Sequence, residues 1–364
     1  MAGKSFFKPG WEVQHKSKMQ LAVLLMTLLA VTACAREPDL EAGPIRWKAQ
    51  AGMPANSWSY EYQFSKFAEL VNERSGGRLV IEVFPPGTIV DAYEQFGAVQ
   101  RKAIEVGMGV GGYNLKQIPE AYIEQGLFGV FSELEDFVDF YIYYKEGAVY
   151  QLLDAAYREK GCHLLKSLGP SHLALISKIP IHTVEEIKGL KIKGSGAESN
   201  LIRNLGAVPV TLAPAEHYMA LQTGTIDGLI VPSYVIGTTN LWDVGKGLLR
   251  PTLGQVAGNI YVNLEAYDSL SDDLKKIVED AAEEAMLYYV ETITRNLEGM
   301  LETAEKEHGV TIVTLPDEEY AKILKAAAPI LDLAAGRSPR SAEIIKLMKE
   351  YLLEKGSPMN RYLQ

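Results

Sequence analysis

Cysteine is nearly missing from this chain of 364 residues, which contains only Cys34 and Cys162. Two cysteines cannot make the disulfide framework that stabilises many small secreted domains. We expect Cys162 to be a small buried apolar side chain without a disulfide partner. The fold must therefore depend on an ordinary hydrophobic core, for which the 47% of hydrophobic residues is ample.

Basic residues are also in short supply. The chain has 36 Lys and Arg against 46 Asp and Glu, and its first 33 residues hold four of the lysines and one of the acids. The rest therefore carries 32 basic and 45 acidic residues, a balance of −13. This charge argues against nucleic acid as a partner, which needs a cationic face. An anionic ligand would have to be captured by local groups.

Catalytic and metal-binding motifs are missing as well. The sequence has no G-x-S-x-G and no H-E-x-x-H, and the histidines after residue 33 show no ligand spacing. These histidines are His163, His172, His182, His217 and His308. We therefore expect no catalytic residue, no metal site and no cofactor.

One glycine-rich segment invites a different interpretation. Residues 107–112 satisfy G-x-G-x-x-G, and Glu133 follows at about the distance that a dinucleotide site requires. However, the glycines fall within and after a predicted strand, and the next segment runs into a proline. We interpret them as positions where the backbone comes close to a ligand or a facing lobe. The alternative is an exported α/β enzyme that uses this loop with Glu94 or Glu105.

Long apolar runs are limited to one, at residues 21–31, and lysines precede it. The run is too short to span a bilayer as a helix but has the length of a signal-peptide core. It leads into V-T-A-C, which resembles a bacterial lipobox. We therefore expect residues 1–33 to be a signal peptide, Cys34 to be lipidated and residues 35–45 to form a tether. The alternative is ordinary cleavage after an A-x-A-like site, residues 33–35, which would leave no anchor.

The remaining sequence alternates short apolar runs with helical segments. In residues 189–232, strands are predicted at 189–193, 208–212 and 226–231, separated by helices that end at Gly206 and Gly224. Residues 47–110 show the same alternation. This pattern predicts an α/β fold with parallel strands flanked by helices, where ligands bind at the carboxyl ends of the strands.

Two sequence runs carry a family resemblance. Residues 189–209 contain GLKI and LGAVP, and residues 220–228 read ALQTGTIDG. Together they resemble the substrate-binding subunit of tripartite ATP-independent periplasmic (TRAP) transporters, and residues 66–89 are similar to the amino-terminal part of that family. The resemblance implies a two-lobed periplasmic binding protein that performs no chemistry. It would close on a small organic acid and deliver it to an integral-membrane permease, touching the membrane itself only through the lipid anchor.

The lobes can be placed approximately. We expect lobe I at 44–168 with part of 256–310, and lobe II at 169–255 with part of 310–364. The lobes should exchange strands where the chain crosses between them, and should not form one continuous sheet. A helical periodicity from Ser271 to about His308 predicts a long helix that braces both lobes, as the family has.

Lys193 is the principal candidate for the binding site. It ends a predicted strand next to Gly194, Ser195 and Gly196, and the following helix start favours anions. The resemblance implies a carboxylate-binding role, but the family usually has arginine here. Lysine offers a point charge without the bidentate grip of arginine, so the ligand acid would be held less rigidly or would not be a simple monocarboxylate.

Further polar and aromatic residues follow the carboxyl ends of predicted strands, where a ligand would lie. Besides Lys193, the expected ligand-binding residues are Gln50, Trp58, Tyr113, His172, Ser195, Ser233, Tyr234 and Asn259. Each alone could instead belong to the core or the rim, and a structural role is the alternative for His172. A second rival function is a lipid-anchored scaffold that contacts only other proteins.

Overall fold

The computed structural model describes residues 43–125 and 127–363, and residues 44–364 belong to one compact unit. The strands are β1 (Ile45–Ala51), β2 (Leu79–Phe84), β3 (Val106–Val110), β4 (Cys162–Leu164), β5 (Gly169–Ser177), β6 (Lys191–Lys193), β7 (Val208–Val210), β8 (Gly228–Pro232), β9 (Gly247–Arg250), β10 (Gly254–Asn263) and β11 (Thr311–Thr314). The prediction of an α/β fold is confirmed.

Helical segments follow most of these strands. They are η1 (Tyr60–Ser65), α2 (Lys66–Arg74), α3 (Gln95–Gln100), α4 (Gly111–Asn114), α5 (Ala121–Glu124), α6 (Leu134–Val138), η2 (Asp139–Tyr143), α7 (Tyr144–Arg158), η3 (Val184–Ile187), α8 (Ala197–Asn204), η4 (Pro214–Glu216), α9 (His217–Thr223), α10 (Val235–Thr238), η5 (Leu241–Asp243), α11 (Leu264–Asp268), α12 (Asp272–Lys306), α13 (Asp317–Ala335), α14 (Pro339–Lys355) and η6 (Pro358–Tyr362). Gly206 and Gly224 end α8 and α9 with φ of 83° and 77°, as predicted.

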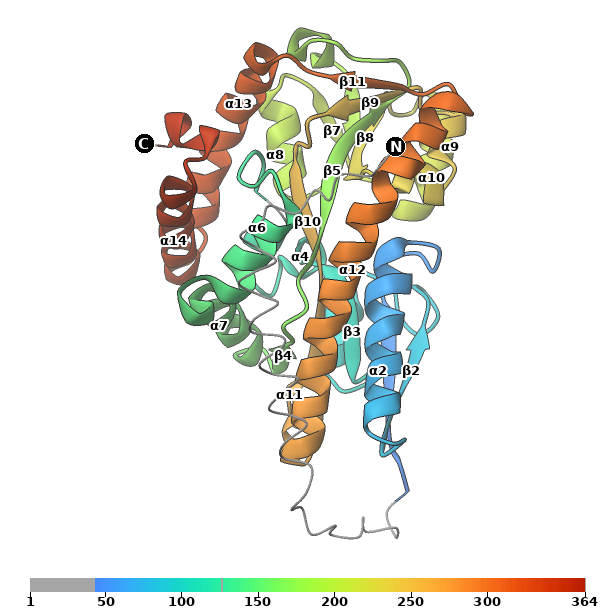
Figure 1. The fold of residues 1–364 in the computed structure, drawn as a ribbon, viewed down its shortest axis with the longest axis vertical. Helices are drawn as coiled ribbons and strands as arrows, with labels where there is room; N and C mark the ends of the chain where they lie inside the picture. Colours follow the sequence, from blue (N-terminus) through green and yellow to red (C-terminus); the bar gives the residue numbers. More distant parts are fainter. Residues whose placement is uncertain (1–42, 126, 364) are drawn as a thin grey trace, which may run out of the picture. The chain divides into compact units, whose positions relative to one another are not determined.

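All described strands belong to one 11-stranded sheet, whose main order is β2-β1-β3-β10-β5-β8-β6-β7. Two parallel groups flank its centre: β2, β1 and β3 form the first strand set, and β8, β6 and β7 the second. The long strands β10 and β5 run antiparallel to each other between the two sets. Figure 1 shows these two strands along the middle of the molecule.

The expectation that residues 44–168 and 169–255 would not share a sheet is wrong. Strand β10 pairs through Gly258–Val262 with β3, and β5 pairs through Leu173–Ser177 with β8. Their other ends, 254–258 and 169–173, pair with each other. Strands of nine and ten residues are long enough to belong to both strand sets at once, so the hydrogen-bonded ladder is continuous.

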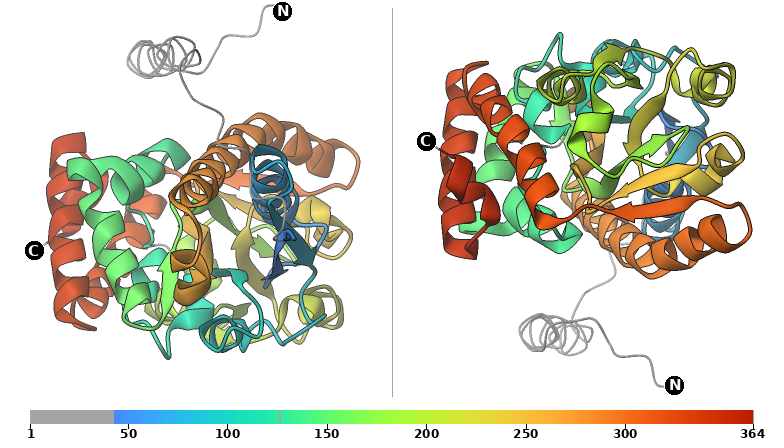
Figure 2. Two further views of the ribbon diagram at one scale, coloured as in Figure 1. Left: turned by 90° about the horizontal axis from the view of Figure 1, so that it is seen from below. Right: turned by 90° about the horizontal axis from the view of Figure 1, so that it is seen from above.

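Helix α12 is the longest helix among the described residues and matches the predicted one closely. Its 35 residues correspond to a length of about 52 Å. It packs against η1 and α2 beside the first strand set, and against α10 and β11 beside the second. Figure 1 shows it running along the whole sheet, while Figure 2 shows α13 and α14 side by side away from it, next to α7.

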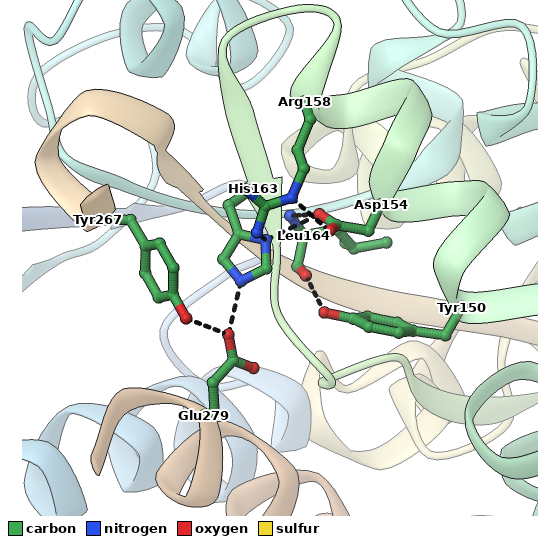
Figure 3. A network of polar contacts seen from close by, with 7 residues as sticks. All are labelled: Tyr150, Asp154, Arg158, His163, Leu164, Tyr267 and Glu279. Atoms are coloured by element: carbon green, nitrogen blue, oxygen red, sulfur yellow. Dashed lines mark hydrogen bonds and ion pairs between the residues drawn. The ribbon is translucent and has the colours of Figure 1, made fainter. Parts of the chain in front are cut away.

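A buried polar network fixes the first half of α12 (Figure 3). The ring of His163 in β4 lies between Asp154 of α7 and Glu279 of α12, at 2.8 and 2.6 Å. Burial of the ring opposes protonation, but the hydrogen bonds to the two carboxylates outweigh burial and raise the pKa of His163. Tyr267 donates a further hydrogen bond to Glu279 at 2.8 Å. The network therefore ties α12 to α7 and β4.

Cys162 is buried, as predicted, and burial raises the pKa of its thiol to about 12. Among the described residues it is the free cysteine. Within the same part of the chain, no helix combines the length and the apolar character that crossing a bilayer would require. The predicted signal peptide, Cys34 and most of the tether lie outside the described residues.

Candidate functional site

The loop after β6 is built from glycines with specific steric roles. A Cβ on Gly194 would lie 2.4 Å from Cδ1 of Ile202 and 3.0 Å from Cβ of Glu198, so a larger residue would require these side chains of α8 to shift. Gly196 has φ of 52° and ψ of −119°, a backbone conformation that residues other than glycine rarely adopt. These two residues turn the chain sharply from β6 into α8. Lys193 therefore lies directly beside the start of a helix, as the sequence predicts.

Lys193 is paired with a carboxylate of its own chain. Its Nζ lies 3.5 Å from Oε2 of Glu198 and donates a 3.5 Å hydrogen bond to the carbonyl oxygen of Ile230. The two side chains are only 13% and 6% exposed. The Glu198 carboxylate also accepts a 2.9 Å hydrogen bond from the backbone N–H of Ser195. The site thus contains a largely buried, fixed ion pair.

Gln125, which follows α5, bridges to this loop from the first half of the chain. Its Nε2 donates to the carbonyl oxygen of Ser195 at 2.9 Å, and its Oε1 accepts from the backbone N–H of Ala197 at 3.2 Å. The sequence predicts free N–H groups at the start of α8 for a ligand. In the structure, Glu198 and Gln125 occupy the N–H groups of Ser195 and Ala197.

Two tyrosines are influenced by the charge of Glu198. Tyr113 of α4 and Tyr93 contact each other edge to face, with ring centroids 4.8 Å apart. Burial raises the pKa of both phenols, and the charges of Glu198 and Asp91 raise it further. Both rings therefore lie within electrostatic reach of Glu198. The structure brings Lys193, Ser195 and Tyr113 together, three of the residues expected at the site.

Gln50 has a structural role, because it holds the backbone of a neighbouring loop. Its amide accepts hydrogen bonds from the backbone N–H groups of Ile89 and Val90, at 2.8 and 3.1 Å, and donates to the carbonyl oxygen of Val90 at 2.8 Å. The side chain is completely buried. Gln50 consequently holds the loop that leads to Asp91 and Tyr93.

A second group of expected residues lies beside α12. Trp58 stacks on Tyr234 at 5.0 Å, and Ser233 donates through Oγ to the carbonyl oxygen of His172 at 3.1 Å. With Ile293 and other residues they line a cavity of about 10 Å³, room for no more than one water molecule. Burial, followed by the charge of Arg250, lowers the pKa of His172 to about 4. In this conformation the group is packed too tightly for an organic ligand.

Asn259 belongs to a third group, a buried network around Glu124. The Glu124 carboxylate accepts hydrogen bonds from the hydroxyl of Tyr157, at 2.8 Å, and from Nδ2 of Asn259. Burial raises the pKa of Glu124 to about 7, although both hydrogen bonds act in the opposite direction. Glu124 immediately precedes Gln125, so this network anchors the segment that reaches the Lys193 loop.

Glutamine at position 124 is expected to change how stability depends on pH. The folded-state pKa of about 7 exceeds the ordinary 4.5, so the folded protein keeps a proton that the unfolded chain releases. The contribution of this carboxyl group to the free energy of unfolding therefore decreases by about 3 kcal/mol as the pH rises from 4.5 to 7. Glu124→Gln should be more stable than wild type by about 1–3 kcal/mol at pH 8, with a smaller difference at pH 4.5.

Chemical denaturation at the two pH values measures this difference. Exposed Glu82 on β2 provides a matched control, because Glu82→Gln should leave the pH dependence unchanged. Parallel stability curves for wild type and Glu124→Gln would show that the buried carboxyl is not the titrating group.

The glycines of 107–112 serve packing. A Cβ on Gly107 would lie 2.6 Å from the ring of Tyr261, and one on Gly111 would lie 2.2 Å from the carbonyl oxygen of Ala121. The helix that follows, α4, has only four residues, whereas a dinucleotide site needs a full helix at this point. These contacts agree with the interpretation that the backbone must approach its neighbours closely.

Several residues at the site were not identified from the sequence. Glu198 had a local signal, because Ser195 and Glu198 form the S-x-x-E pattern of a helix start. Gln125 and Tyr93 had none, since their roles depend on contacts between distant segments. His217 is buried near Lys193, and burial and then the lysine charge lower its pKa to about 3. Within the described residues, no group of His, Cys, Asp and Glu could hold a metal ion.

Comparisons with known proteins agree with this architecture. The family model described as bacterial extracellular solute-binding protein, family 7, matches residues 51–337. A 2,3-diketo-L-gulonate-binding periplasmic protein of Escherichia coli K12 is 26% identical over 301 residues, which cover 78% of this chain and 86% of the relative. An ectoine/5-hydroxyectoine-binding periplasmic protein of Ruegeria pomeroyi is 23% identical over 306 residues, covering 79% and 88%.

A solved structure shows the same fold. The TRAP periplasmic solute-binding protein of Desulfovibrio salexigens with bound orotic acid has a TM-score of 0.78 and 21% identity, with coverage of 85% of this chain and 99% of that one. The two-lobed architecture predicted from the sequence is thereby confirmed. This chain belongs to family 7 of the bacterial extracellular solute-binding proteins and is a periplasmic solute-binding protein of the TRAP type.

Proposed function

We propose that this protein binds a small organic acid through Lys193 and delivers it to the integral-membrane permease subunits of a TRAP transporter. The observation that carries this proposal is the position of Lys193, at the carboxyl end of β6, close to Ser195 and to the start of α8. Relatives are named for 2,3-diketo-L-gulonate and for ectoine, which agrees with a small polar ligand.

Closure of two lobes is the functional event in this proposal. Lobe I is assigned to 44–168 with part of 256–310, and lobe II to 169–255 with part of 310–364. Gln125 joins the lobes next to the ligand, while β5, β10 and α12 connect them. The ligand stabilises the closed form because only that form contacts it from both sides. Trp58, His172, Ser233, Tyr234 and Asn259 are proposed to contact the ligand in a ligand-bound form in which their packing differs from the present one.

A thermal-shift screen of the purified protein against small organic acids tests the function. A hit should raise the melting temperature, and calorimetry should then show saturable heat without turnover. Consumption of the ligand would support the alternative of an exported enzyme with the 107–112 loop. Absence of stabilisation by the whole panel would contradict the proposal and favour a protein-binding scaffold.

We further propose that Cys34 is lipidated and anchors the protein at a membrane surface. The support is the V-T-A-C sequence after an apolar run of signal-peptide length. Mass spectrometry of the native protein should find a diacylglyceryl group on an amino-terminal Cys34. An unmodified amino terminus beyond Cys34 would contradict the anchor without affecting the binding function.

A further inference from the structure

The charges at the Lys193 site nearly cancel. The Lys193 ammonium and the Glu198 carboxylate lie 3.5 Å apart, and both are largely buried. The carboxylate cannot swing away freely, because the backbone N–H of Ser195 also holds it. A ligand carboxylate that reached Lys193 would therefore lie close to a fixed negative charge, and Glu198 would offset much of the attraction from Lys193.

The other charged and titratable groups near the pair do not restore a positive balance. His217 lies on the lysine side and is neutral at ordinary pH because its pKa is lowered to about 3. Tyr93 and Tyr113 are neutral phenols, and Asp91 adds a further negative charge. Among these described groups, Lys193 is the cation, whereas Glu198 and Asp91 are both anions. A simple anion therefore finds an environment that is unfavourable overall.

The same groups suit a positive charge next to Glu198. The Tyr93 and Tyr113 rings contact each other edge to face and lie within electrostatic reach of the carboxylate. Aromatic rings attract ammonium-type cations, but Tyr93 is 45% exposed, so the rings would add only a small contribution. A cation next to Glu198 would therefore gain mainly from the carboxylate.

We propose that the ligand is a small zwitterion, with its carboxylate on Lys193 and its ammonium or amidinium group against Glu198. Such a ligand brings no net charge into a site that is already nearly neutral, and each of its ends finds an opposite charge. The inference rests on the proposed function and narrows its ligand from organic acids in general to those that also carry a cation.

The experiment uses a panel in which each zwitterion is paired with its deaminated analogue. L-Proline with cyclopentanecarboxylate, 4-aminobutyrate with butyrate, and β-alanine with propionate are suitable probes, and dicarboxylates such as malonate complete the panel. Thermal shift ranks the compounds and calorimetry gives the affinities. We expect the tightest ligand to be a zwitterion that binds at least tenfold more tightly than its deaminated partner.

A variant isolates the role of the carboxylate. Glu198→Gln should reduce the preference for the zwitterion over its deaminated partner at least tenfold, whereas Glu305→Gln, on an exposed position of α12, should leave it unchanged. Tightest binding of a mono- or dicarboxylate by wild type would overturn the zwitterion while leaving the proposed function intact. Failure of the whole panel to bind would overturn both. If Glu198→Gln does not fold, the wild-type preference alone decides.

Discussion

Alanine in place of Lys193 should weaken ligand binding about ten- to a hundredfold. A charged hydrogen bond in a site without water contributes about 1.5–3 kcal/mol, which corresponds to this range of affinity. The variant also leaves the Glu198 carboxylate buried without its cation, so the free energy of unfolding should decrease as well. Calorimetry with the ligand found by screening measures the first effect, and chemical denaturation measures the second.

Three further variants separate the two effects. Lys191→Ala removes an exposed lysine from the same strand and should change neither quantity. A double variant, Lys193→Met with Glu198→Gln, should recover stability but not binding, since no buried charge is left unpaired. Lys193→Arg should keep the charge but change the geometry of the ligand contact. Wild-type affinity in Lys193→Ala would place the binding site elsewhere.

Alanine at position 196 is the second substitution for which we expect a large effect. Its φ of 52° and ψ of −119° are nearly exclusive to glycine, and strain of this kind costs about 1–3 kcal/mol. In addition, a Cβ at this position would lie 2.0 Å from Oε1 of Gln125. The substitution should therefore displace the loop that carries Lys193 and weaken binding by about 5- to 150-fold.

Gly189 offers a matched control for the backbone strain. It has φ of 77°, but a Cβ there would meet no atom within 4 Å. Gly189→Ala should reduce stability without a comparable loss of affinity, because it strains the chain away from the ligand. Adding Gln125→Ala to Gly196→Ala should recover part of the binding by removing the clash. Equal affinities of Gly196→Ala and wild type would show that this loop does not form part of the site.

Local sequence signals predicted much of the fold. The periodicity after Ser271 predicted α12 to within a few residues, and Gly206 and Gly224 end their helices as expected. These features depend on neighbours in the sequence, where propensity and capping decide. The continuous sheet could not be predicted in this way. It depends on how β5 and β10 pair with strands far away in the chain.

The candidate site was predictable to the same extent. Lys193 ends β6, Ser195 follows β6 and Tyr113 follows β3, so the rule that ligands bind at the carboxyl ends of parallel strands finds all three. The strand-end rule does not identify the buried charge of Glu198 close to Lys193. The S-x-x-E pattern of a helix start, however, does indicate Glu198. Asn259 lies within β10 and faces Glu124 and Tyr157 in the interior. Which way a polar side chain points is decided by packing, which the sequence pattern does not reveal.

The two long strands and α12 also set the kind of motion that is available. The long strands β5 and β10 and the helix α12 join the strand sets, and the two strands are hydrogen-bonded to each other. Sliding one set past the other would break many ladder hydrogen bonds at once, whereas bending all three segments about a common axis breaks few. The two strand sets should thus open and close by rotation about one hinge axis. A permease would then meet two discrete surfaces, loaded and empty, rather than a continuum of shapes.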